Sequence, residues 1–347
     1  MGNLGISVKR DVGVDIAKGI GIILVVWAHA VGPLTSYIDQ FHMPFFFFIS
    51  GLLYRGRDRK VADYTLRKLK ALLLPFWWWN FLMYPLFFFL YYRGAYSVQT
   101  ALKEILEIVF TVSKVPFLGA TWFLPALFWC SVIVHIVLHI LPDNFKCDLL
   151  VLFAGAGIML IGMNYTLPYR ISRVLVCSFF YISGYFYNRY INKKISRKSK
   201  NILAVIAGVA FAFIGTVNSV DLGGNVYKFK SLYIIGALCA TFCILRLSAL
   251  LSECRVISRF INHVAYLGAN SIDILIWQFL AFRLTIMIQI IIDKLPLSTL
   301  TAFPIYDGTG FWWFIYILAG IYGSLLWTYI LKHNPLSKQM KKLYMIR

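Results

Sequence analysis

The sequence has few charged residues, and acidic residues are the rarest of them. Only 14% of its 347 residues are charged, and 14 Asp or Glu stand against 34 Lys or Arg. Soluble domains carry about 25% charged residues, so this deficit excludes an ordinary soluble protein. Hydrophobic residues make up 60% of the chain. They recur in apolar runs of about 18 residues or more, which predicts a polytopic, all-α membrane protein.

Other features that the chain lacks exclude further classes. The first apolar run is long, carries charges and precedes no small-residue cleavage site, so we expect no cleavable signal peptide. Cys239 and Cys243 have no further ligands nearby for zinc, and packing explains the six cysteines better. The net charge of +20 would suggest nucleic acid in a soluble chain. Here the basic residues lie mainly between apolar runs, beside anionic lipid, and we expect no nucleic-acid partner.

The apolar runs predict about ten transmembrane helices in a single domain over residues 1–347, with no internal repeat. The expected spans are 14–33, 41–55, 70–92, 120–141, 148–163, 170–190, 201–219, 231–251, 264–292 and 310–332. Segment 97–110 is too short and too charged to span, and is typical of an amphipathic interfacial helix. About three-quarters of the Lys and Arg residues fall on one side of this arrangement, which predicts that both termini are cytoplasmic. Residues 333–347 then form a basic cytoplasmic tail.

The first span, DIAKGIGIILVVWAH at 15–29, carries three ionisable residues. Ten residues separate Lys18 from His29, so at about 100° per residue both side chains point the same way, about 16 Å apart along the axis. Asp15 falls near the same stripe. Lys18 could reach the membrane surface with Asp15 as its partner, and His29 could be a neutral ring bonded to a carbonyl. Because charged groups inside a membrane usually face the bundle interior or a water-filled cavity, we favour a functional face.

His29 is a candidate general base, since neutral imidazole is available near pH 7. His42 begins the next span, and the short connection makes the two spans antiparallel neighbours with their histidines at similar depth. A metal would need further ligands, and Asp39 is the one nearby candidate, so we expect no metal. After this span, Arg67-x-x-Lys70 puts two cations on one helical face at the membrane surface, where they could hold phosphate.

At these positions the chain resembles the integral-membrane acyltransferase family 3, and most closely its fucose 4-O-acetylase-like branch. Lys18 and His29 in D-x-x-KGIGIILVVWAH look like the family's basic residue and histidine with ten residues between them, and FHMPFFFFISG follows at the expected interval. Arg67-x-x-Lys70 ahead of a proline corresponds to the family's basic pair. The resemblance continues through TWFLPALF at 121–128 and YLGANSIDILIWQFL at 266–280, so it covers the full chain in order.

The resemblance implies one transmembrane acyltransferase domain in a bacterial cell (inner or plasma) membrane. An acyl group, usually acetyl, would pass from cytoplasmic acetyl-CoA, a co-substrate rather than a bound cofactor, to a hydroxyl of a cell-surface polysaccharide or its lipid-linked precursor. The resemblance makes His29 the catalytic histidine, and we expect His42 beside it to be catalytic as well. The expected donor-binding residues are Asp15, Lys18, Arg67 and Lys70.

The chain departs from the family pattern at two positions. Gln278 stands where a histidine is expected in relatives, so no catalytic role carries over to it. Lys18 replaces the arginine of many relatives, which removes bidentate phosphate geometry but keeps the charge.

Four further residues are candidates for substrate binding: Trp122, Asn270, Ser271 and Asp273. Each has an ordinary alternative, because tryptophan anchors at membrane interfaces and polar side chains often bond neighbouring helices. Asp273 is costly enough inside a span to suggest a polar cavity. Arg170 and Arg173 could meet an anionic sugar or lipid phosphate, although a contact with lipid headgroups is the simpler reading.

Other functions stay open at this point. A transporter or flippase of a glycan or lipid precursor would also carry charged spans, but the repeated halves common in transporters are not visible. A non-catalytic assembly subunit is a third reading, which Gln278 keeps open. For an enzyme, His29 could deprotonate the hydroxyl for direct attack or first take the acyl group itself. The expected partners are acetyl-CoA, a carbohydrate acceptor and membrane lipids, and the chain could form a homo-oligomer.

Overall fold

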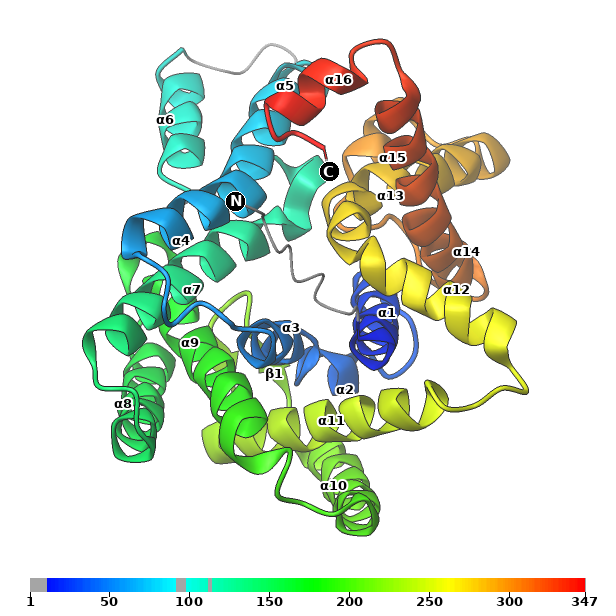
Figure 1. The fold of residues 1–347 in the computed structure, drawn as a ribbon. Coiled ribbons are helices and arrows are strands. Elements are labelled where there is room, and N and C mark those ends of the chain that lie inside the picture. Colours follow the sequence, from blue (N-terminus) through cyan, green and yellow to red (C-terminus); the bar gives the residue numbers. More distant parts are fainter. Residues whose placement is uncertain (1–10, 92–97, 112–113, 347) are drawn as a thin grey trace.

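The computed structural model describes residues 11–91, 98–111 and 114–346, and it shows a multi-pass helical membrane protein (Figure 1). Three ends of expected segments lie outside these ranges: the last residue of span 70–92, the first of segment 97–110 and the last of tail 333–347. The all-α membrane fold expected from the apolar runs is confirmed.

The described residues form sixteen α-helices, and Figure 1 labels them α1 to α16. The first eight are α1 (Val12–His29), α2 (Thr35–Asp39), α3 (His42–Leu52), α4 (Val61–Lys68), α5 (Leu74–Tyr91), α6 (Val98–Val109), α7 (Phe123–Ile140) and α8 (Phe145–Asn164). The others are α9 (Ile171–Phe186), α10 (Arg197–Val217), α11 (Lys230–Leu251), α12 (Ser258–Ala269), α13 (Ser271–Asp293), α14 (Trp312–Leu318), α15 (Ser324–His333) and α16 (Ser337–Lys342).

Short turns and one hairpin complete the chain. The π-helical turns are η1 (Leu69–Leu73), η4 (Tyr187–Ile191) and η6 (Ala319–Gly323), and the 3₁₀ turns are η2 (Pro116–Trp122), η3 (Pro168–Arg170) and η5 (Leu297–Thr301). Strands β1 (Val220–Asp221) and β2 (Val226–Tyr227) pair antiparallel, with Val220 opposite Tyr227.

Eight helices in the described ranges are long and apolar enough to cross a membrane, two fewer than the ten we expected. They are Val12–His29, Val61–Phe89, Pro116–Ile140, Phe145–Asn164, Arg197–Val217, Lys230–Leu251, Ser271–Asp293 and Trp312–His333. The two expected spans that are absent from this set are 41–55 and 170–190, which correspond to α3 and α9.

Both exceptions are inner helices. α3 has 11 residues, which span only about 16 Å. All of them except Ser50 are buried, including the run Phe45–Phe48, so the phenylalanines pack inside the bundle. α9 contacts α3, α7 and α8, and its serines and tyrosines make it less apolar than a lipid-facing span. A helix that neighbours shield from lipid needs neither the length nor the hydropathy of an isolated span.

Glycines let α3 and α9 approach at backbone distance. A Cβ added at Gly51 would lie 1.8 Å from the carbonyl oxygen of Tyr181, and one at Gly184 would lie 1.9 Å from the carbonyl oxygen of Phe48. The two contacts are reciprocal, each helix placing a glycine against a backbone carbonyl of the other. Small residues at membrane helix crossings favour such close packing.

The expected span 264–292 is broken in two. Asn270 ends α12 and begins α13, with φ −101° and ψ 15°, and its Nδ2 donates to the carbonyl of Tyr266 (2.9 Å). α12 packs along α1, while α13 also contacts α1 and continues toward its other end. The break lets one segment of sequence cover two faces around the first helix.

The C-terminal segment folds back onto the bundle. In Figure 1, α16 lies beside α5. Trp79 of α5 donates from Nε1 to the carbonyl of Met345 (3.0 Å), and Met345 and Ile346 are buried. The segment expected as a basic tail therefore packs against the protein as far as residue 346.

The α3–α9 crossing predicts a position-specific effect of one methyl group. Gly51→Ala should lower the free energy of unfolding by about 1–3 kcal/mol, because the methyl would displace a backbone carbonyl. Gly157→Ala on α8 is the matched control, since no atom lies within 4 Å of a Cβ there. The measurement is the thermal midpoint of the detergent-solubilised protein, which should fall for Gly51→Ala alone. Equal midpoints for the two variants would contradict this account of the crossing.

Candidate functional site

His29 is the last residue of α1, and a glutamine fixes the orientation of its ring. Its Nδ1 lies 3.0 Å from Oε1 of Gln278 on α13, while Nε2 of the same amide donates to the carbonyl of Leu275 (3.2 Å). Only an amide NH₂ can donate to a carbonyl, so the amide oxygen faces the histidine and accepts from Nδ1–H. The proton therefore sits on Nδ1, and Nε2 keeps a lone pair that can accept a proton.

His42, at the start of α3, lies beside it. The two ring centroids are 6.4 Å apart in an edge-on arrangement, as expected from the short connection between the helices. Nδ1 of His42 donates to the carbonyl of Ile38 (2.9 Å). Its Nε2 is thus also an acceptor, and the two imidazoles present the same kind of nitrogen.

Both rings line a cavity of about 260 Å³, which we call the histidine cavity. Asp39, Trp122 and Pro304 contribute to its wall, and the β1–β2 hairpin covers it with residues 220–223. Partial burial, followed by repulsion from Asp221, raises the pKa of Asp39 to about 7. In its protonated form this carboxyl can donate as well as accept a hydrogen bond.

The histidine cavity does not contain a recognisable metal site. Within residues 11–91, 98–111 and 114–346, no three His, Cys, Asp or Glu side chains are grouped closely enough to hold a metal ion. Asp39 is near His42, with 3.7 Å between Oδ1 and Nδ1, but that nitrogen already donates to Ile38.

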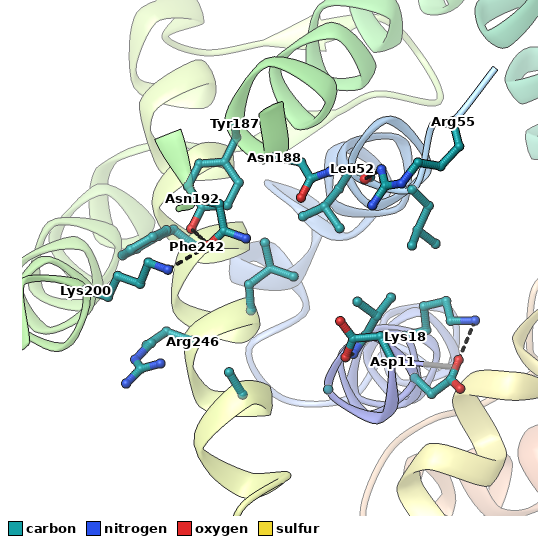
Figure 2. Close-up of a pocket in the computed structure, with 16 residues that line it drawn as sticks. Asp11, Lys18, Leu52, Arg55, Tyr187, Asn188, Asn192, Lys200, Phe242 and Arg246 are labelled. Atoms are coloured by element: carbon teal, nitrogen blue, oxygen red, sulfur yellow. Dashed lines mark hydrogen bonds and ion pairs between the residues drawn. The ribbon is translucent and has the colours of Figure 1, made fainter. Parts of the chain in front are cut away.

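A second cavity lies at the opposite end of α1 and is rich in cations (Figure 2). It measures about 490 Å³ and we call it the basic cavity. Its cationic lining residues are Lys18 of α1, Arg55 after α3, Lys200 of α10 and Arg246 of α11. Asp11 and Asp15 are the acidic residues of the same wall, so cations outnumber carboxylates.

The cations of the basic cavity have partners, and most of these partners are neutral groups. Lys18 pairs with Asp15 (2.8 Å), as the spacing suggested. Lys200 Nζ donates to Asn192 (2.8 Å), as Figure 2 shows, and Arg246 Nε donates to Asn201 (2.6 Å). Nη2 of Arg246 is buried without a hydrogen-bond partner in the described structure. The cavity therefore keeps net positive charge and an unsatisfied donor.

Arg67 lines a neighbouring cavity of about 390 Å³, together with Arg59 and Lys68. Arg55 borders both this cavity and the basic cavity, so the two form a continuous cationic region around the end of α3. Lys70 is placed differently from Arg67. Lys70 lies in the π-helical turn η1, and its Nζ lies 5.0 Å from the ring centroid of Tyr344.

The four candidate substrate-binding residues lie at opposite ends of α1. Trp122 borders the histidine cavity. Gly268, two residues before Asn270, packs against the carbonyl of Asp15, where an added Cβ would lie only 1.8 Å away. Asn270 and Ser271 therefore lie at the Lys18 end, and Asp273 there pairs with Lys332 (3.1 Å).

Sequence reasoning missed several residues of these cavities. Gln278 was set aside because it departs from the family pattern, yet it is the side chain that orients His29. In the sequence, Arg55, Lys200 and Arg246 contribute only to the positive-inside bias. Their basic character is the only clue to a place in the cavity. Asp221 ends the short strand β1 between two spans, where no motif marks it.

A family model described as an acyltransferase domain matches residues 11–333. Comparison with curated proteins and with solved structures gave no match. The matched range includes α1 through α15 and both cavities described above. This multi-pass membrane protein, with a histidine and a cationic cavity at the two ends of its first helix, therefore belongs to the acyltransferase family 3 and is a membrane acyltransferase.

Proposed function

We propose that the protein transfers an acetyl group from cytoplasmic acetyl-CoA to a hydroxyl of a cell-surface polysaccharide or its lipid-linked precursor, as in the fucose 4-O-acetylase-like branch, in a bacterial cell membrane. The observation that carries the proposal is the state of His29. Its Nδ1 is engaged by Gln278, and its Nε2 is left as a base within a cavity.

The cationic region suits a polyanionic donor. Coenzyme A carries phosphates at one end and its thioester at the end of a long arm. The phosphates would lie among Lys18, Arg246 and Arg67, where charge-assisted hydrogen bonds are strongest and Arg246 Nη2 lacks a partner. The arm would follow α1 from Lys18 toward His29, a distance of about 16 Å. This arrangement puts the cationic end of α1 in the cytoplasm, which agrees with the positive-inside bias.

The acceptor would occupy the histidine cavity from the other end. His42 Nε2 can accept from one sugar hydroxyl, and Asp39 and Asp221 can bond others. Trp122 offers an aromatic face for a sugar ring. Asn270, Ser271 and Asp273 lie at the donor end, so in this proposal they support the helix break beside Lys18 rather than touch the sugar.

The chemistry is a direct transfer. Nε2 of His29 takes the proton of the acceptor hydroxyl as its oxygen attacks the thioester carbonyl carbon. A C–O bond forms, the C–S bond breaks, and the thiolate of coenzyme A leaves. The imidazolium then returns the proton to the thiolate, which regenerates the base. Gln278 is a positioning residue in this scheme, because it keeps the Nδ1–H tautomer without touching either substrate.

The first test removes the base. His29→Gln should lower acetyl transfer by about 10²–10⁴-fold, the usual contribution of a positioned acid–base group. Transfer is measured as acetyl release from surface glycan, or as free thiol formed by the purified protein. His263→Gln is the control, since this exposed histidine bonds Tyr322 away from both cavities. Retained transfer in a correctly inserted His29→Gln protein would refute the proposal.

The second test concerns the donor. The double variant Lys18→Ala with Arg67→Ala should weaken acetyl-CoA binding by about tenfold or more, since each lost charged contact is worth about 1.5–3 kcal/mol before compensation. Binding is followed calorimetrically in detergent or nanodiscs. Lys198→Gln is the control, because this exposed cation lies on the same helix as Lys200. A protein that moves a glycan precursor without covalent chemistry would not bind acetyl-CoA at all, and that result would favour a transporter.

The third test asks whether Gln278 acts by orienting His29 and not by binding a substrate. Gln278→Leu should lower kcat by about 10–100-fold, because the imidazole loses the group that orients it, while KM for acetyl-CoA stays nearly constant. Gln278→Glu keeps an acceptor oxygen toward Nδ1 and should recover part of kcat. Equal rates for the wild type and Gln278→Leu would show that the hydrogen bond has no part in catalysis.

A further inference from the structure

A fourth cavity opens beside the histidine cavity, between α7, α9 and the residues that follow α6. It measures about 380 Å³ and its lining is mostly apolar, and we call it the side cavity. Trp129 and Ile133 line it from α7 and are each 46% exposed, while Tyr169 from η3 is 69% exposed. α7 belongs to a candidate membrane span. Exposed apolar side chains of a span face lipid, so this wall is accessible from the bilayer.

Two arginines line the same cavity. Arg170 ends η3 and Arg173 lies in the first turn of α9. Tyr169 and Arg170 both have left-handed backbone, with φ of 54° and 60°, and this turn brings Arg170 to the cavity wall. The guanidinium of Arg173 lies 5.4 Å from the ring centroid of Trp122. Both arginine side chains are partly buried.

Among the described residues, the two arginines are not paired directly with a carboxylate, although Glu107 acts on Arg170 and Asp221 acts on Arg173 from a longer distance. In the described part of the chain, neither arginine has a carboxylate within 4.0 Å. A third cation, Lys114, lies close by. Partial burial and then the charges of Arg170 and Arg173 lower the pKa of Lys114 to about 8. Three neighbouring cations at a membrane-facing cavity attract an anion.

The side cavity and the histidine cavity share Trp122. One indole ring therefore stands between the two arginines and the two histidines. Lys114 is also within electrostatic range of His29. A molecule with its anionic group at Arg173 could extend past Trp122 into the space between His29 and Asp39.

We infer that the side cavity admits an acceptor glycan that is joined through phosphate or pyrophosphate to a membrane polyprenyl chain. The apolar wall on α7 takes the chain, Arg170 and Arg173 bind the phosphate, and the glycan passes Trp122 to reach His29. This inference rests on the proposed function, and it selects the lipid-linked precursor over the finished polysaccharide. A soluble polysaccharide would have no use for an apolar wall open to lipid.

The test is a binding measurement that needs no turnover. Purified protein in nanodiscs is titrated with polyprenyl phosphate, with polyprenol that lacks the phosphate, and with dioleoyl-phosphatidylglycerol. We expect polyprenyl phosphate to bind at least tenfold more tightly than either comparison lipid, as followed by native mass spectrometry. Equal binding of phosphatidylglycerol would show an ordinary phospholipid site and would overturn the inference. Equal binding of polyprenol would also overturn it.

Substitutions of Arg170 and Arg173 then test whether these residues form the binding site. Arg170→Gln with Arg173→Gln should weaken polyprenyl phosphate binding about tenfold or more, whereas the Arg-to-Lys versions should retain most of it. Lys294→Asn is the control, because Lys294 is an exposed cation after α13 with left-handed backbone that asparagine tolerates. Unchanged binding in the double glutamine variant would refute the site. Acetyl-CoA binding should stay the same in all of these variants, which also verifies folding.

The outcomes separate this inference from the proposed function. If polyprenyl phosphate does not bind but the protein acetylates a free glycan in a His29-dependent manner, the side cavity alone is misassigned. If polyprenyl phosphate binds and His29→Gln leaves acetylation intact, the catalytic proposal fails while the lipid site remains.

Discussion

One hydrogen bond, from Nδ1 of His29 to Oε1 of Gln278, determines what the site can do. It joins the end of α1 to the middle of α13, and its direction follows from the second bond of the amide, to the carbonyl of Leu275. A neutral imidazole without this bond would populate both tautomers. The bond to Nδ1 keeps the proton on that nitrogen, so Nε2 is the one available to the cavity. In the proposed reaction, the surrounding helices hold Nε2 of His29 where both the donor and the acceptor can reach it.

The helices around that bond divide into two kinds. α3 and α9 are inner helices, joined at backbone distance by Gly51 and Gly184, and they do not meet the requirements of an isolated span. Among the longer helices, α8 and α10 are the most exposed, whereas α7 and α13 are mostly buried as well. α1 passes through this arrangement with Lys18 at one end and His29 at the other, and α12 and α13 meet beside it at Asn270. α1 therefore has a cationic cavity at one end and an imidazole at the other, the two places that we propose for the donor and the acceptor.

Much of this could be anticipated from the chain alone, and the failures have physical causes. The Lys18–His29 spacing, the neighbouring His42 and the multi-pass helical fold follow from helical periodicity and hydropathy, which are local properties. Two of the ten expected spans, α3 and α9, fall outside the eight helices that are long and apolar enough to cross a membrane by themselves. Both are shielded by protein, which hydropathy along the chain does not reveal. Arg67 and Lys70 share a face in an ideal α-helix, and the sequence did not reveal that Lys70 lies in the π-helical turn η1 with its Nζ near the ring of Tyr344.

The sequence by itself determined that this is a helical membrane protein, that its first helix carries a cation and a histidine in line, and which family pattern these residues match. Only the tertiary structure decided which side chains meet them. Gln278 is 249 positions from His29, and Lys18 shares its cavity with Lys200 and Arg246 from two other helices. Periodicity within one helix fixes the directions of its side chains around its own axis. Contacts between helices depend on where the helices cross, and the crossing points are set by glycines and helix breaks elsewhere in the chain. No local sequence pattern therefore predicts which side chains of two helices meet.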